Sequence, residues 1–153
     1  MEVVAAITKY CQYQERCHSE VRNKLYELGC HTTEVEQNMA LLIENGILNE
    51  ERFARSYARG KFRIKQWGKE KIKYQLRLKK VSDYCIRKAM EEIDEHEYEK
   101  TIIYLIQRKL AELSGERSSF TLRNKIFKYM QGKGFEKDIV IDLLKAQIKN
   151  SKK

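Results

Sequence analysis

A short pattern that recurs about every 50 residues is the feature that most constrains how this chain can fold. Segments of the form apolar-basic-x-x-apolar begin at Val21, Ile72 and Leu122, so successive starts lie 51 and 50 residues apart. A fixed period of this length is typical of proteins built from similar helical units, because one small unit cannot bury its apolar face alone. The period therefore predicts three similar units in tandem.

The residues that follow each of these segments support the same division. In the first unit, Thr33 and Glu36 form a predicted capping box that opens an apolar helix, and Gly46 is the expected stop of that helix. In the second unit, Ser82 is the predicted N-cap of the corresponding helix. In the third unit, this helix follows residues 132–134, whose glycines suit a helix C-cap. Each unit therefore contains a basic helix, a short turn and a more apolar helix.

A further helix is expected before each of these pairs. The predicted ranges of these helices are 5–16, 49–66 and 98–113. The chain has no proline and only 7 glycines, so it lacks the residues that punctuate all-β and loop-rich folds. We therefore predict an all-α fold of about nine helices, arranged as an elongated array of three tandem three-helix repeats. The predicted repeats span 1–46, 47–94 and 95–153.

The sequence predicts neither a signal peptide nor a membrane span. The apolar run from Met1 to Ile7 is short, contains Glu2 and has no basic residues ahead of it. No segment approaches the roughly 20 apolar residues that cross a bilayer. Four cysteines at irregular spacings suit buried, reduced thiols, namely Cys11, Cys17, Cys30 and Cys85. We therefore expect a cytoplasmic protein.

The sequence offers few residues suited to a metal or catalytic site. Cys17-His18 and Cys30-His31 have the chemistry of metal ligands, but their spacing departs from the close Cys-x-x-Cys pattern of structural zinc sites. The acidic residues of 91–99 are better explained as a solvated helix junction than as acid-base or metal ligands. Residues 132–134 are too short for a phosphate-binding glycine loop. We expect no enzyme activity, no metal and no cofactor.

Charge is distributed in bands along the chain. Residues 49–90 contain 14 basic and 4 acidic side chains, which give this segment a net charge of +10, whereas the net charge of the whole chain is +9. The net charges of 1–48, 91–113 and 114–153 are −3, −4 and +6. Concentrated positive charge favours a polyanionic or acidic partner.

An arginine stripe is predicted on the helix at 49–66. At about 100° per residue, Phe53, Tyr57 and Ile64 fall within about 40° of one another and are expected to face the core. The arginines fall on the opposite side, at Arg52, Arg55, Arg59 and Arg63. Guanidinium groups offer forked donors that suit phosphates and carboxylates. The alternative is a solvated helix face without a binding role.

A second basic stripe is predicted on the following helix, beside the apolar pair Ile72 and Leu76. Its residues are Lys69, Lys73, Arg77 and Lys80. Trp67, just before Gly68, either anchors the bend between the two helices or stacks on a base, and we favour the anchor.

Residues 60–66 also fit a short strand, because Phe62 and Ile64 alternate with basic residues. The helical stripe that begins at Phe53 continues through the same residues without a break. We therefore favour a helix, although Gly60 in its interior costs about 1 kcal/mol.

Several runs of residues resemble the signature of the RecX family of recombinase regulators. These runs are Arg16-x-x-x-Glu20-Val21-x-x-Lys24-Leu25, residues 48–54 (LNEERFA) with Tyr57, Trp67-Gly68 with Lys71-Ile72 and Gln75-Leu76, and Lys80-Val81-Ser82. The resemblance covers nearly the whole chain and is strongest from Glu20 to Met90.

The resemblance implies a protein that binds the RecA recombinase filament on single-stranded DNA and limits its extension and activity without catalysing a reaction. By this analogy, the two basic stripes would meet acidic protein surface, DNA phosphates or both. The alternative function is a helical DNA-binding module that regulates by acting directly on single-stranded or double-stranded DNA. We expect a monomer in either case.

Overall fold

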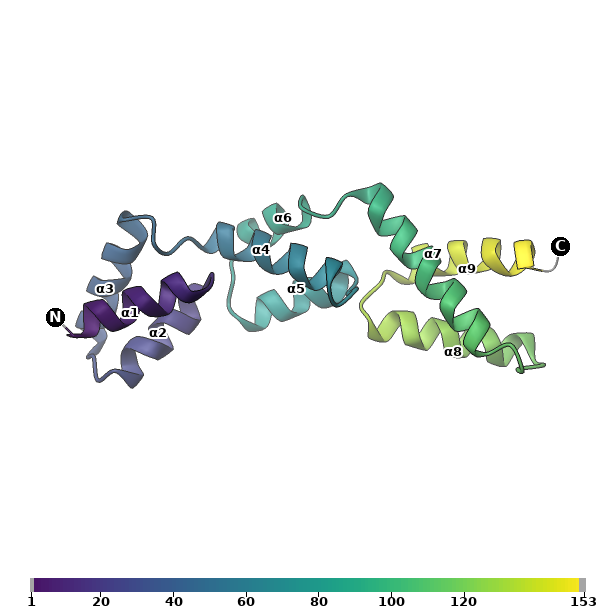
Figure 1. The fold of residues 1–153 in the computed structure, drawn as a ribbon, viewed down its shortest axis with the longest axis horizontal. Coiled ribbons are helices and arrows are strands. Elements are labelled where there is room, and N and C mark those ends of the chain that lie inside the picture. Colours follow the sequence, from purple (N-terminus) through teal and green to yellow (C-terminus); the bar gives the residue numbers. More distant parts are fainter. Residues whose placement is uncertain (1, 152–153) are drawn as a thin grey trace. The chain divides into compact units, whose positions relative to one another are not determined.

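The computed structural model describes residues 2–151, and the regular structure in that range is entirely helical (Figure 1). The nine helices of the described residues are α1 (Glu2–Tyr13), α2 (His18–Glu27), α3 (Thr32–Glu44), α4 (Glu50–Arg63), α5 (Lys69–Leu78), α6 (Asp83–Met90), α7 (Glu95–Glu112), α8 (Ser119–Gly132) and α9 (Lys137–Ser151). The all-α prediction is confirmed. The elongated arrangement and the limits of the three repeats stay predictions.

The helices pack into two compact units. The first unit runs to Arg59 and also includes Gln75–Glu92, so it contains α1 to α3, most of α4 and α6. The second unit comprises Gly60–Tyr74 and the chain from Ile93 onward, so it contains most of α5 together with α7 to α9. Two boundaries between the units therefore fall within helices: one follows Arg59 in α4, and the other follows Tyr74 in α5.

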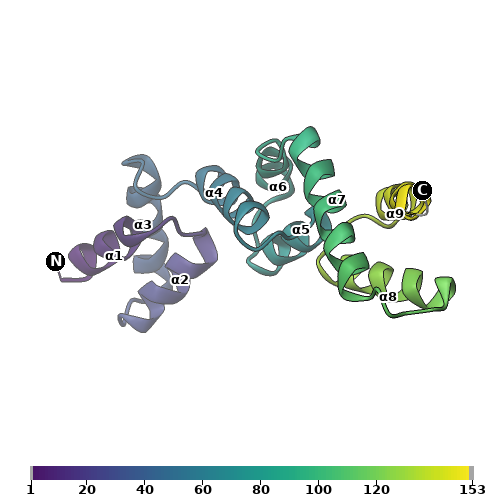
Figure 2. The same ribbon diagram turned by 45° about the vertical axis from the view of Figure 1, so that its right-hand side comes forward.

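The core of the first unit is formed largely by apolar residues spaced four apart on α1, α2 and α3, which lie together in both views (Figures 1 and 2). Val21 and Leu25 come from α2 and Val35 and Met39 from α3. This spacing places each pair on one face of its helix, so burial of that face stabilises the helix. The hydroxyl of Ser19 also donates a hydrogen bond to the carbonyl of Lys79 at 2.7 Å, which ties α2 to the α5–α6 turn.

The core of the second unit is centred on α7, which lies beside α8 and α9 in both views (Figures 1 and 2). Helix α7 buries one face between Tyr98 and Ile106. The buried residues of the three helices are Tyr98, Ile102, Leu105, Ile106, Ile126, Met130, Val140, Leu144 and Ile148. On α9 the buried face is formed by Val140, Leu144 and Ile148, whereas Ile139 and Leu143, which helical spacing predicted to be apolar core positions with Leu144, are half-buried.

Two glycines allow the start of α5 to contact the turn between α8 and α9 closely. The amide of Gly68 donates to the carbonyl of Lys133 at 2.7 Å, and the amide of Glu70 donates to the carbonyl of Gly134 at 2.9 Å. A Cβ on Gly68 would overlap the backbone of Gly134, and a Cβ on Gly134 would overlap Lys71. Carbonyls of a distant turn thus cap the first amides of α5, which have no partner within their own helix.

Four predicted helix limits are wrong by about one turn. Helix α1 begins at Glu2 rather than at residue 5 and ends at Tyr13 rather than at residue 16. Helix α4 ends at Arg63 rather than at residue 66, because the chain leaves the helix and Gln66 adopts a φ of 56°. Helix α7 begins at Glu95 rather than at residue 98, because the Asp94 carboxylate accepts a hydrogen bond from the amide of Glu97 at 2.9 Å.

The end of α4 also corrects the predicted direction of Ile64. Its side chain is 80% exposed, because it lies beyond the last helical residue, whereas Phe53 and Phe62 are buried and Tyr57 is half-buried. The alternative of a strand at 60–66 is wrong as well, since residues 60–63 belong to α4.

The predicted capping box of α3 is displaced by two residues. Helix α3 begins at Thr32, and the amide of His31 donates to the Glu34 carboxylate at 3.3 Å. Glu36 instead pairs with Arg22 at 3.0 Å. The predicted cap of α6 is confirmed, because the Ser82 hydroxyl accepts a hydrogen bond from the amide of Cys85.

No helix within residues 2–151 has both the length and the apolar character needed to cross a membrane.

Candidate interaction surface

The basic residues predicted to bind a partner are divided between the two compact units. The first unit contains Arg52, Arg55, Arg59, Arg77 and Lys80, and the second contains Arg63, Lys69 and Lys73. Their surroundings differ more than the sequence pattern suggests.

Arg52 serves the fold of the first unit. Its guanidinium donates to the Glu15 carboxylate at 2.6 and 2.8 Å and to the carbonyls of Gly46 and Ile47 at 3.1 Å each. Hydrogen bonding to Glu15 raises the pKa of Arg52 above its ordinary value. The side chain therefore ties α4 to the chain after α1 and to the α3–α4 turn.

Arg55 and Arg59 face acidic residues of the same unit. Arg55 lies 3.0 Å from Glu51 one turn earlier, 3.3 Å from Glu91 and 3.7 Å from Glu92. Arg59 donates to Glu92 at 2.6 Å. Hydrogen bonding to Glu51, with support from the charges of Glu91 and Glu92, raises the pKa of Arg55. The middle of the arginine stripe is thus neutralised by the acidic residues that follow α6.

Arg77 and Lys80 present a different situation at the end of α5. Both side chains are exposed, and neither has an ion pair with another residue of the described range. Lys80 lies in the α5–α6 turn with a φ of 62°, which directs the chain into the cap of α6. These two cations are available to a partner without prior displacement of a carboxylate.

In the second unit, Arg63 is exposed at the end of α4 and has no ion pair among the residues that the structure describes. Lys73 lies 3.8 Å from Glu70 on its own helix. Lys69 has a side chain only 14% exposed, and its ammonium group lies 2.5 Å from Glu95 and 4.7 Å from the centre of the Tyr98 ring. Lys69 therefore packs as part of the unit, unlike Arg63.

Trp67 is half-buried, and two basic side chains of the second unit lie over its ring. The ammonium groups of Lys61 and Lys71 lie 4.9 and 4.7 Å from its ring centre. The amide of Trp67 also donates to the carbonyl of Lys61 at 3.1 Å, just after α4 ends. These contacts agree with the anchoring interpretation, because cations occupy the positions over the ring that a base would need.

The acidic residues of 91–99 have partners that the sequence interpretation did not assign to them. Glu91 and Glu92 pair with arginines of α4, Glu95 pairs with Lys69, and Asp94 caps α7. A signal for this pairing was present, since a band of net charge −4 directly follows the band of +10. Opposite charge bands brought together by short turns favour ion pairs within the fold.

A buried hydrogen-bond network holds the start of α5 in the second unit. Tyr98 is 2% exposed; its hydroxyl accepts a hydrogen bond from the amide of Lys69 at 2.9 Å and donates one to the Glu136 carboxylate. Burial, followed by the hydrogen bond to Glu136, raises the pKa of Tyr98 above its ordinary value. The ring also packs 5.7 Å from Phe62 and 5.4 Å from Phe135.

The cysteines are buried free thiols. Burial raises the pKa of the Cys11 and Cys17 thiols, and the Cys17 thiol donates to Glu20 at 3.0 Å. Within residues 2–151, no three side chains of His, Cys, Asp or Glu are grouped so that they could hold a metal ion.

Comparison with known proteins finds one family whose model matches residues 49–90, described as RecX, second three-helix domain. Two relatives named Regulatory protein RecX are those of Lactococcus lactis subsp. cremoris strain SK11, 29% identical over 143 residues, and Clostridium botulinum strain Eklund 17B, 27% identical over 144 residues. These alignments cover 90% and 94% of this chain and 53% and 67% of the relatives. The chain therefore spans about half the length of the Lactococcus protein.

Two solved structures have the same fold. The crystal structure of RecX from Lactobacillus salivarius matches with a TM-score of 0.86 and 25% identity over 95% of this chain and 94% of that one. A second, described as regulatory protein RecX, matches with a TM-score of 0.84 and 19% identity over 95% of this chain and 70% of that one. These relatives are named as regulatory proteins rather than as enzymes.

Proposed function

Because this chain belongs to the RecX family of regulatory proteins, we propose that it binds the RecA filament on single-stranded DNA. In this proposal it limits filament extension and activity as a non-enzymatic modulator. The observation that carries the proposal is that the residues matched by the family model are also the most basic part of the chain. The family's second three-helix domain matches residues 49–90, the same residues that hold a net charge of +10.

The surroundings of the basic residues suggest how they divide the work of binding. Arg63, Arg77 and Lys80 are exposed and lack ion pairs within the described chain, so they are the first contacts for acidic protein surface or DNA phosphate. Arg55 and Arg59 become available only when the carboxylates of their partly buried ion pairs are displaced.

Arg52 and Lys69 have a different role in this proposal, because their side chains already tie elements of the fold together. Replacing either residue is expected to lower the stability of the fold, and any loss of partner binding would follow from that loss of stability. The only ion pair of Lys73 in the described range is with Glu70 at 3.8 Å. Lys73 therefore resembles Arg63, Arg77 and Lys80, which are available to a partner, more than it resembles Lys69.

The test compares two triple variants in binding to RecA filaments assembled on single-stranded DNA. Arg63→Ala/Arg77→Ala/Lys80→Ala is expected to weaken binding roughly tenfold and to lower its dependence on salt, since three charge contacts are lost. Lys9→Ala/Lys100→Ala/Lys128→Ala removes the same charge from exposed positions elsewhere and should bind nearly as the parent does. Equal binding by the two variants contradicts the proposed surface.

The alternative function, a module that regulates through DNA alone, predicts a different result. It requires tight binding to free DNA and no effect on RecA filaments. Measuring the same variants on free oligonucleotides separates the two functions, because only the leading proposal requires the filament.

A further inference from the structure

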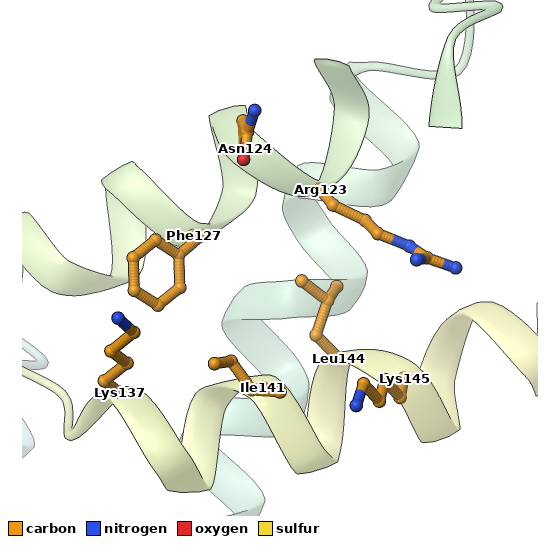
Figure 3. A pocket seen from close by; sticks show the side chains of 7 residues that line it. All are labelled: Arg123, Asn124, Phe127, Lys137, Ile141, Leu144 and Lys145. Carbon is orange, nitrogen blue, oxygen red and sulfur yellow. The ribbon is translucent and has the colours of Figure 1, made fainter. Parts of the chain in front are cut away.

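A groove between α8 and α9 of the second unit combines an apolar floor with a positively charged rim. Its volume is about 320 Å³. The floor is formed by Phe127, Ile141 and Leu144. In Figure 3, Phe127 reaches from α8 toward α9, and Ile141 and Leu144 rise from α9 toward α8. An apolar depression of this size accepts one or two large side chains of a partner.

Three cations flank this floor at its two ends. Figure 3 shows Lys137 at the end nearest Phe127, and Arg123 and Lys145 at the other end. Asn124 completes the lining. No carboxylate lines the groove, although Asp138 and Asp142 lie elsewhere on α9. The rim is therefore positively charged on both sides of the apolar floor.

These cations differ from Arg55 and Arg59 of α4 in having no counterion among the residues that the structure describes. Within the described residues, Arg123, Lys137 and Lys145 form no ion pair, whereas Arg55 and Arg59 are paired with glutamates. Lys137 lies 5.8 Å from the centre of the Phe127 ring, so its aliphatic stem extends the apolar wall while its charge stays at the rim.

We propose that this groove binds a protein segment in which a large apolar side chain is flanked on both sides by acidic residues. The apolar side chain fills the space over Ile141 and Leu144, and the flanking carboxylates pair with Lys137 at one end and with Arg123 and Lys145 at the other. The partner needs both properties. A purely acidic segment would leave the apolar floor exposed to water, and a purely apolar segment would leave the three cations without carboxylate partners.

The composition of the floor favours a peptide over a nucleic acid. Ile141 and Leu144 offer no hydrogen bonds to base edges, and Asn124 is the one uncharged polar side chain in the lining. Single strands are held mainly by stacking on successive aromatic rings along a basic groove, and here Phe127 is the one aromatic residue in the lining. The groove shares no residue with the basic surface discussed above, so this inference does not rest on binding to RecA.

The test uses the whole chain and a fluorescein-labelled peptide with a central Leu-Phe pair flanked on both sides by aspartates and glutamates. Fluorescence anisotropy should show binding by the parent. Arg123→Glu/Lys145→Glu should weaken binding roughly tenfold or more, because two attractive contacts become repulsive. Lys128→Glu/Lys149→Glu makes the same change at exposed positions of α8 and α9 outside the groove and should have a much smaller effect.

Two further measurements separate the apolar contribution from general charge. Replacing the central Leu-Phe pair of the peptide by Ala-Ala should abolish binding, and amide NMR shifts on adding the original peptide should concentrate at 123–127 and 137–145. The proposal is overturned by absence of binding, by equal loss in both double variants, or by tolerance of the Ala-Ala peptide. It is also overturned if a thymidine oligonucleotide, rather than the peptide, depends on Arg123 and Lys145.

Discussion

At the scale of single residues, Tyr98 has the most demanding position in the second unit. Its hydroxyl is the partner of the Lys69 amide and of the Glu136 carboxylate, and its ring packs against Phe62 and Phe135. A buried amide that loses its partner costs roughly 1–3 kcal/mol. The sequence showed that Tyr98 begins an apolar helical pattern, but its hydroxyl partners lie 29 and 38 residues away and could not be inferred.

We predict that Tyr98→Phe lowers the free energy of unfolding by about 1–3 kcal/mol at neutral pH, because the ring stays and only the hydroxyl is lost. Urea denaturation followed by circular dichroism measures this difference. Tyr104→Phe, at an exposed position of the same helix, is the control and should be nearly neutral. A neutral Tyr98→Phe contradicts the structural role assigned to this hydroxyl.

The same variant gives a pH signature with a definite sign. The raised pKa of Tyr98 means that the folded protein keeps the phenolic proton to higher pH than the unfolded chain does. The stabilisation is therefore complete below the ordinary phenol pKa of about 10 and is lost as the pH rises above it. The parent should lose stability above this pH more steeply than Tyr98→Phe, and parallel curves would contradict the assignment.

At the scale of elements, α4 illustrates what a helical pattern can and cannot predict. The helical period of about 100° per residue predicted that Phe53 faces the core and that the arginines face away from it, and Phe53 is buried. It failed for Ile64, because the helix ends at Arg63 and the period no longer applies. Periodicity is local, so it identifies the faces of a helix better than its limits.

The partners of the arginines were beyond the reach of such a pattern. Arg59 and Glu92 are separated by 33 residues, and their contact depends on the packing of three helices and two turns. The close approach of Gly68 and Gly134 could not be predicted from a sequence pattern either, because the start of α5 meets the α8–α9 turn only in the folded second unit. The all-α class of fold was predictable from the sequence, whereas the pairing between elements was not.

We predict that Glu91→Gln/Glu92→Gln strengthens binding to RecA filaments about two- to fivefold at low salt, because these carboxylates compete with the partner for Arg55 and Arg59. Filament binding measured over a range of salt concentrations tests this. Glu97→Gln/Glu99→Gln changes the net charge equally at exposed positions and is the matched control. An equal gain in both variants would indicate a general charge effect and contradict the specific competition.

At the scale of the whole molecule, positive charge and recognisable family sequence coincide in one part of the chain. Residues 49–90 hold the net charge of +10 and match the family's second three-helix domain. The first and third parts of the chain supply similar helices with different surfaces, including the groove between α8 and α9. The period of about 50 residues predicts three such segments in tandem.

The most direct test of the proposed function is the rate of ATP hydrolysis by RecA on single-stranded DNA, with this protein added at substoichiometric amounts during filament growth. We predict that the rate falls, and that Arg63→Ala/Arg77→Ala/Lys80→Ala causes a weaker fall at the same dose. An unchanged rate of hydrolysis and unchanged filament growth, with the parent protein folded and present, would contradict the account.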